Sequence, residues 1–139
     1  MQITTPTTWE DVLRMPDDGN RYEFIGGRLY MTPAPVIRHH DVSHRLESAL
    51  RRTLERTGHG RVFDAPVLVE FPGTGDRVQP DIFFVSNARR GIVGEKQMTG
   101  APDLVVEILS PLHSTPRPRR QARSVRTMRC TRILDRGPD

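Results

Sequence analysis

The chain has 139 residues, enough for one small domain with a hydrophobic core, although only 35% of them are hydrophobic. Its single cysteine, Cys130, excludes an intrachain disulfide framework, and no apolar run approaches the roughly 18 residues of a membrane span. Residues 1–111 hold 12 Arg and 1 Lys against 15 acidic residues (net −2), whereas residues 112–139 hold 8 Arg against 2 (net +6). We therefore expect a soluble, cytoplasmic protein with no membrane partner, whose basic character belongs to the tail.

The first half of the chain predicts a short helix, a hairpin and a long helix. A threonine cap before Trp9, acidic residues in the first turn and Pro16 after the end predict the short helix. Residues 22–25 and 28–31 flank a Gly-Gly turn and read as a hairpin. From His39 to Thr57 the apolar residues recur at helical spacing, which predicts the second helix.

The second half predicts three strands and a loop. Residues 62–71 read as one strand with Val67, Val69 and Phe71 on one face, and residues 76–86 as a strand centred on Ile82 to Val85. Residues 87–100 read as a loop or a poor helix, and "PDLVVEILS" as the most strongly buried strand. The order is αββαββ and a further β, which predicts an α+β domain with a mixed sheet.

Three carboxylates stand beside apolar neighbours in these strands, namely Glu23, Asp81 and Glu107. A buried carboxylate must be neutralised, paired or bound to a metal, because an isolated buried charge is too costly. Mg²⁺ uses one or two carboxylates together with waters and phosphate oxygens. The alternative for each carboxylate alone is an ion pair with one of the many arginines. The presence of all three favours a shared metal site.

Two neighbouring motifs leave alternatives open. Asp103 repeats the Pro-Asp pair and shares a strand face with Glu107, so both could reach one metal, although a solvated strand start is favoured. His39 and His40 open the long helix, where a neutral histidine could cap or contact the site. An exposed position in the first turn is the favoured interpretation of both histidines.

The motifs "YEFIGGRLYMTPAP", "HHDV", "VQPDIFFV" and "GAPDLVVEILSP" occur in the order found in the Uma2 family, also known as DUF820. Residues 7–111 resemble that family, which is similar to restriction endonucleases of the PD-(D/E)xK fold. The resemblance implies a mixed β-sheet core flanked by helices, with Glu23, Asp81 and Glu107 as catalytic, metal-binding acids. It also implies Mg²⁺ (or Mn²⁺) as cofactor and DNA as substrate, and it marks His39 as a family-typical position. A homodimer is left open.

The sequence departs from this family after Pro111. A PD-(D/E)xK site needs a lysine, but Leu109 stands two residues past Glu107, and Lys96 is the only lysine of the chain. The family ending "GVPEYWIVDP" is absent, yet codons allowed for residues 124–139 encode it when they are read in a shifted frame. We therefore divide the chain into an incomplete nuclease domain, residues 1–111, and a frameshifted tail, residues 112–139.

This division predicts a domain truncated at its C-terminus and an endonuclease that is inactive in this form. Arg-rich, weakly apolar sequence of the tail's kind is expected to be disordered and to leave the edge of the last strand open. The alternative is a non-catalytic nucleic-acid-binding protein that uses the Arg-rich tail.

Overall fold

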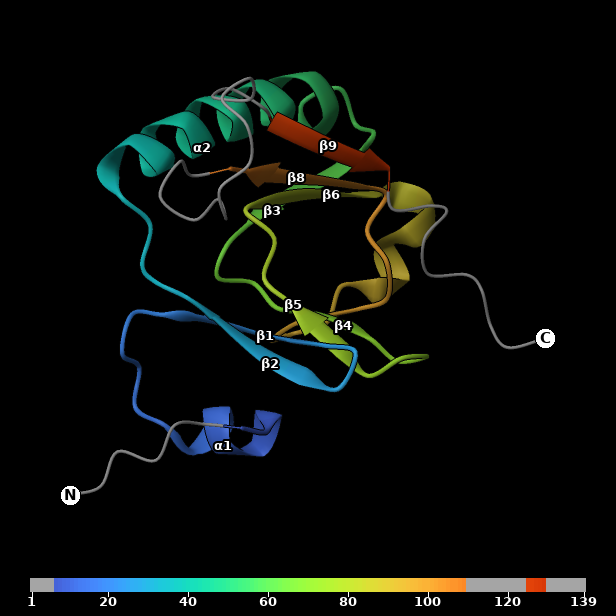
Figure 1. Ribbon diagram of the computed structural model, residues 1–139. Helices are drawn as coiled ribbons and strands as arrows, with labels where there is room; N and C mark the ends of the chain where they lie inside the picture. The colour runs from blue at the N-terminus through green and yellow to red at the C-terminus, as the bar shows by residue number, and fades with distance from the viewer. Residues whose placement is uncertain (1–6, 110–124, 130–139) are drawn as a thin grey trace.

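A computed structural model of the chain describes residues 7–109 and the backbone of residues 125–129. Two β-sheets lie between two helices (Figure 1). The long helix α2 covers the outer face of one sheet, and the short helix α1 lies beyond the other. Among the described residues, no helix has both the length and the apolar character needed to cross a membrane.

The first sheet has the strand order β2-β1-β5-β4-β7. The strands are β1 (Arg21–Ile25), β2 (Arg28–Thr32), β4 (Val69–Phe71), β5 (Asp76–Val78) and β7 (Met98–Thr99). Helix α1 (Trp9–Arg14) begins at Thr8, whose side chain accepts a hydrogen bond from the backbone N–H of Asp11. The Asp11 carboxylate accepts the N–H of Thr8 in return, so the helix is capped as the sequence predicts. The Trp9 side chain is buried and its ring lies under the guanidinium of Arg77 on β5.

The second sheet has the order β3-β6-β8-β9. Its strands are β3 (Gly60–Asp64), β6 (Ile82–Ser86), β8 (Leu104–Ile108) and β9 (Val125–Arg129), all antiparallel to their neighbours. Helix α2 (Ile37–Leu50) continues into a π-helical turn, η1 (Arg51–Glu55), and a 3₁₀ helix, η2 (Asn87–Ile92), follows β6. Gly60 is required at the start of β3, because a Cβ there would lie 2.2 Å from the carbonyl oxygen of Val85.

The core has two layers, which are separated by β6. Ile82 and Phe84 of this strand face α2 and pack with residues of β3, β8, α2 and η1, namely Val62, Val106, Leu46, Leu50 and Leu54. Phe83 and Val85 face the first sheet and pack with Val69, Phe71 and Met98. All four apolar residues of β6 are buried. This strand therefore fixes the position of both sheets and of the long helix, and its first residue follows directly on Asp81.

The predicted α+β fold with a mixed sheet is confirmed, and so are both helices, the hairpin and the last predicted strand. Two predictions of continuous strands were wrong. Residues 62–71 divide between β3 and β4, and residues 76–86 between β5 and β6, with each pair split across the two sheets. Pro66 and Pro80 stand at the two breaks, where a residue without an N–H cannot continue the ladder. Residues 87–92 form the 3₁₀ helix η2 within the predicted loop.

The expectation of an open edge beside the Glu107 strand differs from the structure. The backbone of β9 pairs with β8 over five residues, from Leu104↔Arg129 to Ile108↔Val125. Ladder hydrogen bonds join main-chain groups, so an unpaired edge accepts an extended segment with little regard to its side chains. The rest of the predicted tail, residues 112–124 and 130–139, lies outside the described residues, and the division of the chain after Pro111 stays a prediction.

Replacing Phe83 by Ala tests the position of β6. Phe83 is fully buried and stacks on Phe63 with ring centroids 5.3 Å apart. We expect Phe83→Ala to lower the free energy of unfolding by about 3–5 kcal/mol, because it removes buried surface and leaves a cavity. Urea denaturation followed by circular dichroism measures the change. Leu13→Ala is the control, because Leu13 is 70% exposed and its loss should cost within about 0.5 kcal/mol. Equal midpoints for the two variants would contradict the described core.

Candidate active site

Asp81 is the buried acidic residue at the start of β6, with 3% of its surface exposed. Its Oδ1 accepts a 2.7 Å hydrogen bond from Nη2 of Arg21 on β1, which also makes an ion pair. Its Oδ2 accepts a 2.7 Å bond from the backbone N–H of Ile108 on β8, and Nε2 of His39 on α2 lies 3.3 Å from the same oxygen. Groups from both sheets and from the long helix therefore meet on one carboxylate.

These contacts determine the charge state of Asp81. Burial alone would raise its pKa, because it disfavours the charged form. The Ile108 N–H, the hydrogen bond and charge of Arg21 and the charge of His39 outweigh burial, and they hold the pKa of Asp81 below its ordinary value of 3.8. Asp81 is therefore ionised at neutral pH and fixed in direction by its three contacts.

Glu107 faces Asp81 across the β6–β8 ladder. The register Ile82↔Val106 places Glu107 opposite Asp81 when it is continued by one residue. Burial raises the pKa of Glu107 to about 8, helped by the charges of Asp81 and Glu23 and by a hydrogen bond with the Asp81 carboxyl group, while Arg21 opposes the shift. Glu107 thus holds a proton at neutral pH, and the facing carboxyl groups carry one negative charge between them.

Glu23 lies nearby on β1 but is held differently. Its Oε1 accepts a 2.8 Å hydrogen bond from the backbone N–H of Gln79, in the segment that leads from β5 to Asp81. Its charge contributes to the raised pKa of Glu107, so it acts on the same centre. The structure thus brings Asp81 and Glu107 together, with Glu23 close enough to affect Glu107. Within residues 7–109, however, no three His, Cys, Asp or Glu side chains form a group that could hold a metal ion.

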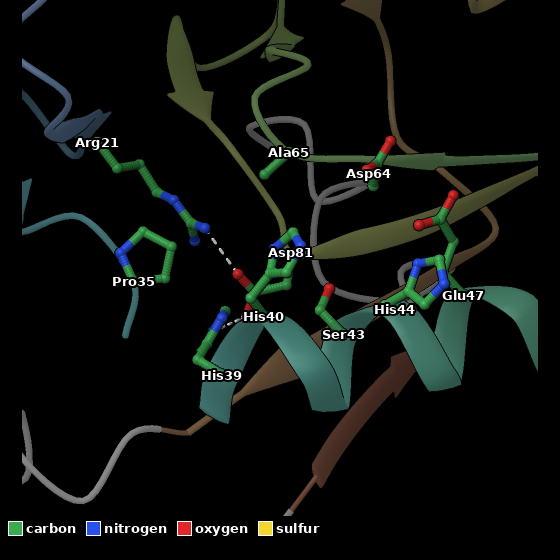
Figure 2. A pocket seen from close by; sticks show the side chains of 10 residues that line it. All are labelled: Arg21, Pro35, His39, His40, Ser43, His44, Glu47, Asp64, Ala65 and Asp81. Carbon is green, nitrogen blue, oxygen red and sulfur yellow. Dashed lines mark hydrogen bonds and ion pairs between the residues drawn. The ribbon is translucent and has the colours of Figure 1, made fainter. Parts of the chain in front are cut away.

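A hollow of about 180 Å³ opens between α2 and the strand ends (Figure 2). Arg21, His39 and Asp81 lie together in it, joined by the two contacts of Asp81 (Figure 2). The other side chains that line it are Pro35, His40, Ser43, His44, Glu47, Asp64 and Ala65. Burial and the charge of Glu47 raise the pKa of Asp64, although Arg51 opposes this shift. Arg21 and His39 therefore lie beside Asp81, whereas Glu47 and Asp64 lie together in another part of the hollow (Figure 2).

The remaining sequence candidates have other places. Asp103 accepts a 2.7 Å hydrogen bond from the backbone N–H of Ser86, at the end of β6 opposite to Asp81, so it supports the strand and does not join Glu107. His39 is half-buried against Asp81, which differs from the exposed position favoured by its sequence context, whereas His40 is exposed at the hollow. Lys96 is exposed and does not line the hollow.

Sequence reasoning missed Arg21 and the Ile108 N–H. Arg21 stands two residues before Glu23, and alternate residues of a strand share a face, so the pair could have been placed beside one another. Nothing local distinguishes Arg21 from the other arginines of residues 1–111. The Ile108 donor is a backbone group and carries no sequence signal.

The fold agrees with comparisons to known proteins. The family model described as "Uma2: Putative restriction endonuclease" matches residues 9–123. The chain belongs to the Uma2 family. A crystal structure of "a putative nuclease belonging to DUF820" from Anabaena variabilis ATCC 29413 is similar in fold, with a TM-score of 0.61 and 24% sequence identity. The match covers 78% of this chain and 62% of that one, so the chain spans less than two thirds of the Uma2 structure's length. No curated protein matches the chain.

The raised pKa of Glu107 predicts how stability varies with pH. Between its ordinary pKa of 4.5 and about 8, Glu107 keeps a proton in the folded state that the unfolded chain has lost. Its contribution to the free energy of unfolding therefore falls as pH rises across this window and levels off above it. Glu107→Gln should flatten this fall and leave the variant more stable than the parent at pH 8. Urea denaturation at pH 5 to 9 measures it.

Glu95→Gln is the matched control, because Glu95 is exposed on the loop before β7. It should leave the pH dependence unchanged. A Glu107→Gln variant whose stability follows the parent's at every pH would show that Glu107 is ionised in the folded state.

Proposed function

We propose that this Uma2 domain is a metal-dependent DNA endonuclease. In its active site, Asp81 and Glu107 bind one Mg²⁺ or Mn²⁺ ion, and Glu23 is the third acidic residue. The observation that carries the proposal is that the strand register places Asp81 and Glu107 opposite each other. Two facing carboxylates repel each other, and a divalent cation between them removes that repulsion. The family description, "Putative restriction endonuclease", supports phosphodiester hydrolysis and DNA as the substrate.

The residues fit a hard divalent cation. Mg²⁺ takes oxygen ligands and keeps several waters, so one or two protein carboxylates suffice. This agrees with a site that offers two facing carboxylates and no three-ligand group among the described residues. The Ile108 N–H orients one Asp81 oxygen, and the Gln79 N–H orients Glu23. When bound, the cation would stabilise charge that develops on the phosphate oxygens during hydrolysis.

Among the described residues, no lysine lies at the hollow, where the proposed reaction needs one. Leu109 is 55% exposed two residues beyond Glu107, and Lys96 lies away from the hollow. Without a cationic side chain at the attacking water, both proton transfer and charge stabilisation are weakened. We propose that the 139-residue chain is inactive or nearly so for this reason. Codons allowed for the residues after Pro111 permit an Asp-x-x-x-Lys pattern when they are read in the shifted frame.

A plasmid-nicking assay tests the function. One base is deleted after codon 111, so that the following codons are read in the frame that encodes the family ending. The resulting repaired protein is incubated with supercoiled DNA and Mg²⁺. We expect nicking by the repaired protein that disappears with EDTA and falls at least about 100-fold in Asp81→Asn. Asp103→Asn is the matched control, since Asp103 follows a proline in the same way but lies at the opposite end of β6. It should keep its activity.

The outcomes separate the proposal from its alternative. If the unrepaired 139-residue chain still binds DNA in EDTA and with Asp81→Asn, and this binding weakens steeply with salt, the function belongs to the Arg-rich tail. Nicking by the unrepaired chain at the repaired protein's rate would show that residues 112–139 belong to the working enzyme. Equal loss in Asp81→Asn and Asp103→Asn would remove the special role of Asp81.

Proton release tests the metal site without an activity assay. Because Glu107 is protonated at pH 7, binding of Mg²⁺ there should expel about one proton. Calorimetry in two buffers of different ionisation enthalpy measures the number of protons released per Mg²⁺ bound. The experiment uses the unrepaired 139-residue chain. Glu107→Gln should release close to none and bind Mg²⁺ more weakly, whereas Glu95→Gln should match the parent. Binding of Mg²⁺ with no proton release would place the ion away from Glu107.

A further inference from the structure

Arg21 uses only part of its hydrogen-bonding capacity on Asp81. Its guanidinium has five N–H groups, and one of its nitrogens, Nη2, donates to Oδ1 at 2.7 Å. Within residues 7–109 it forms no other hydrogen bond, and its side chain is 19% exposed where it lines the hollow. The fork of donors is therefore fixed at one end and open to the hollow at the other (Figure 2).

The same carboxylate is the proposed ligand of a divalent cation, so Arg21 and the cation compete for it. Both are positive, and close approach of the cation to Asp81 repels the guanidinium. Arg21 lies on β1 of the first sheet, whereas Glu107 lies on β8 of the second and Asp81 directly precedes β6, so the Arg21 side chain can turn away without moving the strands that hold the two carboxyl groups. A displaced guanidinium needs a new anion, and a phosphate fits its planar fork.

We propose that Arg21 is a ligand of the substrate phosphate, held on Asp81 until a divalent cation takes that carboxylate. The proposal rests on the proposed function and adds to it the residue that binds the phosphodiester. In the metal-free protein Arg21 neutralises a buried charge. In the metal-bound protein it provides a cationic contact to DNA beside Asp81, in the hollow that both residues line.

If Arg21 exchanges Asp81 for phosphate, its removal should change the affinity for the metal and the affinity for DNA in opposite directions. If Arg21 only stabilises Asp81, then removing it should weaken the carboxylate site and hence the binding of both metal and DNA. If Arg21 competes with the metal and then binds phosphate, removing it should strengthen metal binding and weaken DNA binding. The difference in sign separates phosphate binding from a purely structural role.

The experiment compares Arg21→Gln, Arg21→Lys and Arg90→Gln in the 139-residue chain. Arg90 is an exposed arginine on η2, which follows the end of β6 opposite to Asp81, so its variant removes the same charge at a distance. Mn²⁺ affinity is measured by electron paramagnetic resonance of the free ion. Affinity for a labelled 16-base-pair duplex is then measured at saturating Mn²⁺ over a series of salt concentrations.

We expect Arg21→Gln to bind Mn²⁺ at least about threefold more tightly than the parent, because it lacks a repelling charge. It should bind the duplex about tenfold more weakly, with a salt slope smaller by about 0.9. Arg21→Lys should keep the parent's slope because it keeps the charge, and Arg90→Gln should keep the parent's Mn²⁺ affinity.

Weaker Mn²⁺ binding by Arg21→Gln, or a duplex affinity and salt slope equal to the parent's, overturns the exchange while the metal site stands. Absence of Mn²⁺ binding in the parent overturns both this inference and the proposed function. A double variant controls for folding: Asp81→Asn removes the buried charge that Arg21 neutralises and keeps an oxygen for the Ile108 N–H. Adding Arg21→Gln to Asp81→Asn should still lower duplex affinity if Arg21 binds phosphate, and an unchanged affinity overturns the inference.

Discussion

The burial of one ionised carboxylate organises this end of the molecule. Asp81 is 3% exposed, and removing such a charge from water costs several kcal/mol unless nearby donors compensate. The compensation comes from Arg21 on β1, from the backbone of Ile108 on β8 and from His39 at the start of α2. These elements belong to different layers of the fold, so satisfying the charge also positions the layers. The contacts that compensate the buried charge therefore also fix the positions of β1, β8 and α2 around Asp81.

The distribution of donors explains why two facing carboxyl groups differ in charge. Asp81 takes the N–H of Ile108 and the guanidinium of Arg21, and its pKa falls below its ordinary value. Glu107 is left with burial and two negative neighbours, and its pKa rises to about 8. The pair resembles other carboxylate dyads, in which two like charges in contact cannot both ionise without a counter-charge. The proposed divalent cation would neutralise both groups, whereas Arg21 neutralises one.

Much of the fold followed from local sequence, whereas the connections between layers did not. The cap at Thr8, the Gly26-Gly27 turn and the apolar spacing of α2 each depend on neighbours within a few residues, so they were predictable. The division of two predicted strands between sheets depends on partners far along the chain, which periodicity does not encode. Two Pro-Asp pairs look alike in sequence, yet Asp103 only supports Ser86. Arg21 escaped notice because its importance lies in a contact 60 residues away.

Strand β8 has one requirement for folding, at its edge, and another for the proposed chemistry, beyond Glu107. Along its edge, β9 pairs through main-chain groups, a requirement that a wide range of sequences can meet. Beyond Glu107 the proposed reaction requires one specific side chain, a lysine, and Leu109 has neither its charge nor its proton. If the sequence changes frame after Pro111, as predicted, the two properties are affected unequally: the extended β9 still pairs with β8, but the lysine that the proposed reaction needs is lost. The facing carboxyl groups Asp81 and Glu107 are positioned by residues before that point, so the proposed metal site depends on the part of the chain that precedes Pro111.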